Sequence, residues 1–286
     1  MNHSESPEVV QRTRHYYDSD SADRFYASIW GGNDIHIGIY ENPEESIAPA
    51  SRRTVERMAA RLPQPGRQMR VLDIGAGYGG SARHLVQTWS CPVTCLNLSA
   101  VQNERNRQLN RQGGLTEFID VIDGSFEDLP FADAAYDVVW SQDALLHSGR
   151  RARVLEEVNR VLRPGGSFLF TDPMQADDCP PESLGPVLRR IHLESLGSLG
   201  FYRAAAQKLG WTEQAWEDLS PHLAAHYARV LGEVERRGPE LCEACGAEYV
   251  ANMQTGLRHW IDAGQAGRLC WGVFHFQKPA GNGAAA

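Results

Sequence analysis

Residues 70–80 read RVLDIGAGYGG, and this stretch decides the fold. It begins as an apolar run with β-branched residues, which is typical of a buried parallel strand. Closely spaced glycines follow, and from Ser81 the apolar residues return at helical spacing. A strand, a glycine turn and a helix form the entry unit of a nucleotide-binding α/β sheet. In such a unit the glycines let the backbone approach a ligand, and the helix start offers unpaired N–H groups.

The spacing of the glycines fits two kinds of ligand. Gly75, Gly77 and Gly80 match the G-x-G-x-x-G pattern of dinucleotide sites, whereas Gly75, Gly77 and Gly79 match the G-x-G-x-G pattern of S-adenosylmethionine sites. Asp73 lies two residues before the first glycine, and a carboxylate there suits a ligand that carries an ammonium group. The stretch favours S-adenosylmethionine, and NAD remains the alternative at this point.

The composition indicates a globular protein whose main partner is not nucleic acid. The chain has 286 residues, of which 42% are hydrophobic and 22% charged, and its formal net charge is −8 at pH 7. The N-terminus is polar and the apolar runs are too short to span a membrane, so we expect a cytoplasmic protein. The six cysteines are scattered, and Cys242 and Cys245 form a lone C-x-x-C. We expect two thiols there and no metal site.

Further strands are expected to alternate with helices along the chain. Their expected positions, after the strand of the glycine turn, are residues 91–97, 118–122, 136–140, 167–174 with its loop, 211–219 and 269–276. Ligand sites in open α/β sheets lie outside the carboxyl ends of the strands. Polar residues that follow these strands are therefore the candidate ligand contacts.

Two strand ends are expected to hold a nucleoside. Asn97 closes the second strand about 20 residues after the glycine turn, where such folds bind the ribose hydroxyls. Gln102 lies one turn into the next helix and can reach the same pocket. Gly124, Ser125 and Phe126 follow the third strand over the expected adenine position, where the phenyl ring can stack and the hydroxyl can bond the base edge.

The polar run from Gln142 to His147 follows the fourth strand, where chemistry is expected; a buried structural role for His147 stays open. Before the sheet begins, Tyr26, Trp30 and His36 belong to a dense aromatic and polar cluster. This cluster suits a helix on the sheet edge or a lid that excludes water, and both can hold.

The motifs together resemble class I S-adenosylmethionine-dependent methyltransferases. The resemblance rests on VLDIGAG at 71–77, on LPF at 129–131 followed by YDVV at 136–139, and on VLRPGG at 161–166. It implies a Rossmann-like α/β sheet of seven strands, the last antiparallel.

Other stretches resemble sarcosine/dimethylglycine N-methyltransferases more closely. They are CLNLS at 95–99, WSQDALLHS at 140–148, TDPM at 171–174 and GSLGFY at 197–202. The resemblance runs from about Tyr16 to Lys278. In that family Asn97 stands where an acid is usual, whereas Ser125 stands where relatives in the wider superfamily carry an aspartate.

The resemblance implies an enzyme that makes glycine betaine, an osmoprotectant, from a small zwitterionic amine. Implied cofactor contacts are Tyr17, His36, Asp73, Gly75, Ala76, Gly77, Asn97, Leu98, Gln102, Gly124, Ser125, Phe126, Gln142 and His147. Expected substrate contacts are Tyr26, Trp30, Met174, Arg189, Arg190, Tyr202 and Trp271. Aromatic faces suit the sulfonium and the quaternary ammonium product, and an arginine suits the carboxylate. Trp30, Tyr202 and His147 are the expected catalytic residues, with His147 or His36 as proton acceptor.

The expected organisation has five parts. They are an N-terminal helical lid at 1–66, an S-adenosylmethionine-binding core at 67–175, a helical cap at 176–210, C-terminal strands and helices that complete the sheet at 211–279, and a disordered tail at 280–286. Three other functions stay open: methylation of another small amine such as phosphoethanolamine, NAD-linked oxidoreduction, and non-catalytic sensing of an adenosyl ligand. The sequence leaves the oligomeric state open.

Overall fold

The computed structural model describes residues 11, 14, 18, 20–31, 33–62, 68–191 and 193–281. Most of the first 19 residues of the expected lid, its last four residues and the last five residues of the expected tail lie outside them. The helices are α2 (Asp20–Ile29), α3 (Ile47–Ala59), α4 (Gly80–Trp89), α5 (Ala100–Gln112), α6 (Arg151–Val161), α7 (Gly185–Ile191), α8 (Leu199–Lys208), α9 (Ser220–Arg236), α10 (Gly238–Cys245) and α11 (Ala247–Gln265), with 3-10 turns η1 (Leu145–His147) and η2 (Pro181–Leu184). Within these residues no helix has the length and apolarity needed to cross a membrane.

Seven strands form one sheet, in the order β3-β2-β1-β4-β5-β9-β7. They are β1 (Val71–Ile74), β2 (Val93–Asn97), β3 (Ile119–Asp123), β4 (Tyr136–Gln142), β5 (Leu162–Thr171), β7 (Thr212–Asp218) and β9 (Gly272–Gln277); β6 (Met174–Gln175) and β8 (Leu269–Cys270) form a separate pair. Strand β9 runs antiparallel to both of its neighbours, while the pairs from β3 to β5 are parallel. The predicted seven-stranded sheet with an antiparallel last strand is confirmed.

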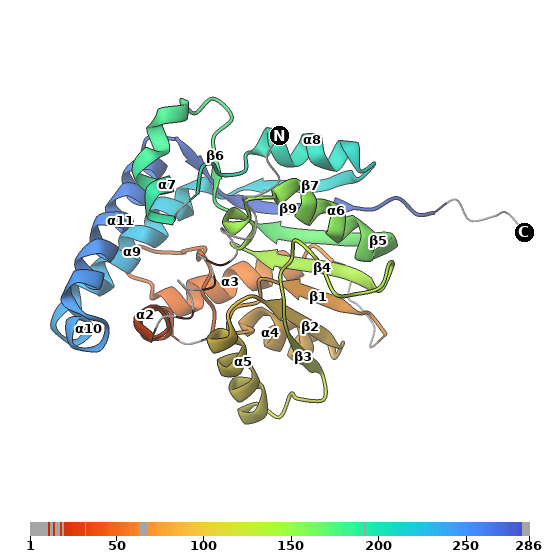
Figure 1. Ribbon diagram of the computed structural model, residues 1–286, viewed down its shortest axis with the longest axis horizontal. Helices are drawn as coiled ribbons and strands as arrows, with labels where there is room; N and C mark the ends of the chain where they lie inside the picture. Colours follow the sequence, from red (N-terminus) through yellow and green to blue (C-terminus); the bar gives the residue numbers. More distant parts are fainter. Residues whose placement is uncertain are drawn as a thin grey trace, which may run out of the picture.

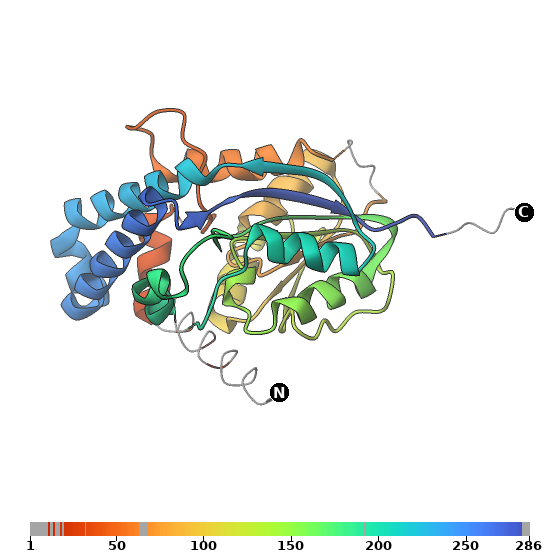
Figure 2. The same ribbon diagram turned by 90° about the horizontal axis from the view of Figure 1, so that it is seen from above.

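Helices cover both faces of the sheet. Its central strands β1 and β4 are therefore buried along almost their whole length. Leu72 and Ile74 pack with the apolar side of α6 and α8, whereas Val71 packs with α3 and α4. This alternation is the period of two that a strand imposes on its side chains. Figure 2 shows α3, in orange, on one face and α6 and α8, in green and teal, on the other.

A second group of helices forms a cap at the carboxyl ends of the parallel strands (Figure 1). The cap consists of α2, α7, α9, α10 and α11. Helix α2 packs against α9 and α10, and α11 packs against α9, α10 and α7. Apolar side chains from α2, α9, α10 and α11 form a core of their own.

The helices are arranged differently from the expected organisation in three places. Helix α8 belongs to the sheet, not to the predicted cap at 176–210, because Tyr202 and Ala206 pack into the core beside β5. Helices α9 to α11, predicted to complete the sheet, instead form most of the cap. The predicted lid at 1–66 also divides, since α2 lies in the cap and α3 packs against the sheet.

Candidate functional site

One pocket lies between the strand ends and the cap. We call its two walls the strand-end side and the cap side. The strand-end side consists of Gly75, Gly77, Asn97, Leu98, Ser99, Gln102, Gly124, Ser125, Phe126, Glu127, Gln142, Asp143, Ala144, Leu146, His147 and Pro173. The cap side consists of Tyr26, Trp30, Ile35, His36, Ile37, Arg190, Ile191, His226, Tyr227, Met253, Leu257 and Trp260. The pocket brings together most of the residues that the sequence singled out.

The glycine turn requires glycine at its first position. Gly75 has φ of 75°, and a Cβ there would lie 2.4 Å from the Cβ of Ala144. Its N–H donates to the carbonyl oxygen of Leu96 at 2.8 Å, so the turn is fixed to β2 as it leaves β1. Backbone conformation and crowding both exclude a side chain at this point, so the chain passes close to the pocket without filling it.

Asn97 and Gln102 meet at the end of β2. The Asn97 amide nitrogen donates to the Gln102 side-chain oxygen at 3.0 Å, and Ser99 caps α5 by accepting from the Gln102 N–H. The Asn97 amide oxygen then remains an acceptor, which is the group that a ribose hydroxyl requires.

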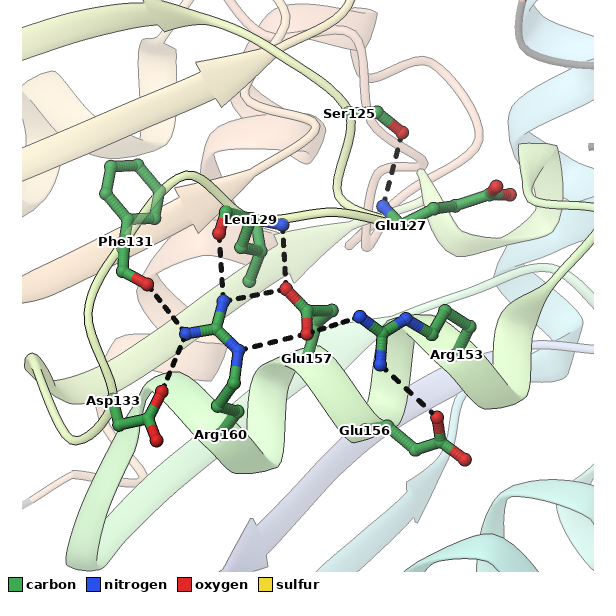
Figure 3. A network of polar contacts seen from close by, with 9 residues as sticks. All are labelled: Ser125, Glu127, Leu129, Phe131, Asp133, Arg153, Glu156, Glu157 and Arg160. Carbon is green, nitrogen blue, oxygen red and sulfur yellow. Dashed lines mark hydrogen bonds and ion pairs between the residues drawn. The ribbon is translucent and has the colours of Figure 1, made fainter. Parts of the chain in front are cut away.

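Helix α6 holds the loop after β3 in place (Figure 3). The buried Glu157 carboxylate accepts from the Leu129 N–H at 2.8 Å, and Arg160 donates to the carbonyl oxygens of Leu129 and Phe131. Ser125 Oγ accepts from the Glu127 N–H, so its own hydroxyl hydrogen can be donated to a ligand. The loop is therefore fixed to α6 by its backbone, and Ser125 lines the pocket.

Asp143 joins the two walls, a role that the sequence did not reveal. One of its carboxylate oxygens accepts from the Ile37 N–H and the other from the Trp271 Nε1–H, both at 2.7 Å. The residue has φ of 50°, which aspartate tolerates better than most residues. Asp143 thereby ties the segment after α2 to the end of β4.

A buried acidic pair lies behind the glycine turn. Burial, with a smaller contribution from Asp34, raises the pKa of Asp73 to about 8. Asp34 pairs with Arg52 at 3.0 Å through one oxygen, and among the described residues its other oxygen has no hydrogen-bond partner. A cationic group placed near this pair would offset the cost of its charge. The glycine turn and the Asn97 acceptor line the pocket and fit the nucleoside part of S-adenosylmethionine, while the acidic pair lies behind them.

The cap side is largely aromatic. Trp30 is 6% exposed, and its ring lies 5.2 Å from Tyr26 and 5.5 Å from His226, measured between centroids. Arg190 reaches this wall through a gap in α11: a Cβ at Gly256 would lie 1.9 Å from Arg190 Cδ. The Arg190 Nη2 lies 2.6 Å from Met253 Sδ. The cap side of the pocket thus combines aromatic rings with the guanidinium group of Arg190.

The histidines of the pocket are weak bases. Desolvation, with a smaller contribution from the Arg190 charge, lowers the pKa of His147 to about 4. Burial also lowers the pKa of His36 below its usual value. Both rings are therefore neutral near pH 7.

Several expected contacts are not part of the pocket. Tyr202 is 1% exposed in the core, where its hydroxyl donates to Asp172 at 2.7 Å, so the expected catalytic contact with substrate is corrected. Trp271 and Met174 are fully buried, the first bonded to Asp143 and the second in β6. Arg189 is exposed and points away from this wall, unlike its neighbour Arg190.

Two expected cofactor contacts, Asp73 and Ala76, are buried just behind the glycine turn rather than on the pocket surface. Tyr17 lies outside the described residues. His226, Tyr227 and Trp260 line the cap side although the sequence did not single them out. For His226 a signal exists: it interrupts the buried apolar stripe of α9 formed by Leu223, Val230 and Val234.

Comparisons with known proteins agree on one family. A family model described as a methyltransferase domain matches residues 72–170. The chain is 53% identical to the sarcosine/dimethylglycine N-methyltransferase of Aphanothece halophytica, over 95% of this chain and 98% of that protein. It is 56% identical to the glycine/sarcosine/dimethylglycine N-methyltransferase of Actinopolyspora halophila over 93% of this chain, but spans only 47% of that longer protein.

A solved structure from Galdieria sulphuraria, provisionally assigned as a sarcosine dimethylglycine methyltransferase, superposes with a TM-score of 0.88. It is 44% identical to this chain and covers 92% of it, and 99% of the Galdieria chain is covered in turn.

Proposed function

Because the chain belongs to the family of sarcosine/dimethylglycine N-methyltransferases, we propose that it methylates dimethylglycine, and also sarcosine, with S-adenosylmethionine as methyl donor. Glycine betaine is then the final product, with the osmoprotective role expected from the sequence. One observation carries the proposal: the glycine turn on the strand-end side and the aromatic rings and Arg190 on the cap side line the same pocket.

The strand-end side is proposed to hold the methyl donor. Bound S-adenosylmethionine supplies an electrophilic methyl group on a sulfonium centre. The Asn97 amide oxygen accepts from the ribose hydroxyls, while Ser125 and Phe126 contact the adenine. Gln142 Nε2 is a buried donor without a partner among the described residues, and it lies on the same wall.

The cap side is proposed to hold the amine. The faces of Trp30 and Tyr26 stabilise positive charge as it passes to nitrogen, and Arg190 binds the carboxylate. The apolar members of the wall exclude water, which strengthens these interactions. Met174 lies in the core, so the apolar contacts with the amine from the strand-end side come from Pro173, after β5, and from Ala144 and Leu146, after β4.

The proton of the amine leaves before reaction, because a protonated amine has no lone pair. The sequence predicts His147 or His36 as its acceptor, but burial lowers the pKa of both rings, to about 4 for His147, which makes them poor proton acceptors at neutral pH. We propose instead that His147 orients the substrate as a neutral hydrogen-bonding group. Solvent then takes the proton as the amine enters.

Steady-state rates with four amines test the function. We expect sarcosine and dimethylglycine to be methylated with kcat/KM at least about 100-fold above that for phosphoethanolamine, whose phosphate requires more cationic groups than Arg190 supplies. Glycine is expected to react more slowly than sarcosine. A preference for phosphoethanolamine would contradict the proposal, and binding of S-adenosylmethionine without turnover of any amine would indicate a sensor.

A further inference from the structure

His226 occupies an unusual position in the cap. It lies on α9, is 1% exposed and lines the pocket beside Trp30. A polar ring on the buried face of a helix normally satisfies both of its nitrogens. Among the described residues, the hydrogen bonds of His226 involve its Nδ1 only.

The neighbours of His226 fix its tautomer. Its Nδ1 lies 3.1 Å from the backbone nitrogen of Gly38, and a backbone N–H can only donate, so Nδ1 must carry the lone pair. The Tyr40 hydroxyl lies 2.9 Å from the same atom. Gly38 is itself held against α3, since a Cβ there would lie 2.6 Å from the Cβ of Ala50.

The second nitrogen is therefore a hydrogen-bond donor. A neutral imidazole has one ring proton, which must lie on Nε2 when Nδ1 accepts. Burial lowers the pKa of His226 to about 3, so the ring stays neutral. Among the described residues no group bonds to Nε2, while the ring borders the pocket.

We propose that His226 is a specificity-determining residue whose Nε2–H donates a hydrogen bond to the carboxylate of the amino-acid substrate, on the same wall as Arg190. The inference rests on the proposed function and names the group that selects for a carboxylate. A buried N–H meets its requirement with a carboxylate oxygen but not with a methyl group or an ammonium. Substrates that carry no acceptor oxygen at this position leave the donor unpaired, which weakens their binding.

Two variants of His226 separate its two nitrogens. His226→Asn keeps an acceptor near the Nδ1 position for the Gly38 N–H and removes the pocket donor, whereas His226→Gln can restore a donor near Nε2. His222→Asn is the matched control, because His222 Nδ1 accepts from the Tyr40 N–H at 3.1 Å one turn earlier on α9 and does not line the pocket. Each variant is assayed by steady-state kinetics with dimethylglycine and with N,N-dimethylethylamine, which carries no acceptor oxygen.

We expect His226→Asn to raise the KM for dimethylglycine by about 10-fold or more, with less than about twofold change in the S-adenosylmethionine Kd. His226→Gln should recover most of this loss. The preference for dimethylglycine over N,N-dimethylethylamine should fall by a similar factor in His226→Asn only. Three results would overturn the inference. They are an equal loss of kcat/KM for both amines, an equal rise in the KM for dimethylglycine in His226→Asn and His222→Asn, or weaker binding of S-adenosylmethionine in His226→Asn.

A measurement on the unmodified protein covers the case in which a variant fails to fold. In ¹⁵N-histidine-labelled protein with S-adenosylhomocysteine, the His226 nitrogens should report the Nε2–H tautomer, and added dimethylglycine should shift the Nε2–H signal. An unshifted signal at saturating dimethylglycine would overturn the inference while leaving the proposed function intact. Failure of the unmodified protein to methylate dimethylglycine would overturn both.

Discussion

The two walls of the pocket are built in different ways. The strand-end side comes from residues 75–147 and Pro173, each within a few positions of a strand end, and backbone hydrogen bonds fix much of its shape. The cap side comes from three separate parts of the chain, residues 26–37, 190–191 and 226–260, joined by packed side chains.

Because of this difference, we expect one wall to bind the methyl donor and the other to select the amine that accepts the methyl group. A wall made of sheet ends and tight turns tolerates little change, because a side chain added there meets backbone or a neighbouring strand. A wall made of side chains on helices can change its chemistry one residue at a time. We therefore expect substitutions in the glycine turn and after β2 and β3 to affect cofactor affinity, and those on the cap side to affect the amine.

The largest effect is expected from Gly75→Ala. The added methyl group meets the Ala144 Cβ, and alanine is strained at φ of 75°. S-adenosylmethionine affinity should fall by at least about 100-fold by calorimetry, since a displaced turn closes the approach to the ligand.

The matched control is Gly114→Ala, which has φ of 65° and no atom within 4 Å of the new Cβ. It carries the backbone strain without the clash, so it should lose about 1 kcal/mol of stability and bind the cofactor normally. If Gly75→Ala and the control bound S-adenosylmethionine with equal affinity, the glycine turn would not be part of the cofactor site.

A smaller and more selective effect is expected from Gly256→Ala in the cap. In an open helix this change stabilises by about 1 kcal/mol, but here the Cβ would overlap the Arg190 side chain and displace it. The KM for dimethylglycine should rise about 10-fold, with the cofactor Kd nearly unchanged.

Gly232→Ala, on α9 with nothing within 4 Å of the new Cβ, should be neutral or stabilising. If Gly256→Ala changed cofactor affinity as much as the KM for the amine, the division of labour between the walls would be wrong.

A further prediction concerns the pH dependence of stability, which neither wall of the pocket controls through ligand contacts. Asp73 in the folded protein has a pKa of about 8, well above the ordinary carboxyl value. Between about pH 4 and pH 8 the folded chain holds a proton that the unfolded chain has lost, so stability falls as pH rises through this window.

The slope from Asp73 is at most about 1.4 kcal/mol per pH unit, and Asp73→Asn should remove it. Urea unfolding of both proteins at pH 6 and pH 8 measures the difference. Parallel pH dependence in the two proteins would show that Asp73 is not protonated in the folded state.

The contrast between the walls also shows which parts of the site could be predicted from the sequence. Gly75, Asn97, Ser125, Phe126 and His147 follow strands directly, so local pattern and the general rule for open sheets placed them correctly in the pocket. Their positions need no knowledge of how distant helices pack.

The cap could not be predicted in the same way. Tyr202 and Trp271 have the chemistry of a substrate site, but the first lies on the side of α8 that packs on β5 and the second bonds to Asp143. Side-chain type does not reveal which face of a helix meets the sheet. His226 could have been found, because a histidine within the apolar stripe of a helix requires a partner.

The most direct test follows the transferred group itself. The protein is incubated with S-adenosylmethionine that carries a trideuterated methyl group and with dimethylglycine, and the products are measured by mass spectrometry. We predict glycine betaine three mass units heavier than its unlabelled form, in equal amount to S-adenosylhomocysteine. S-adenosylhomocysteine formed without labelled betaine, or no turnover with either dimethylglycine or sarcosine, would contradict the account.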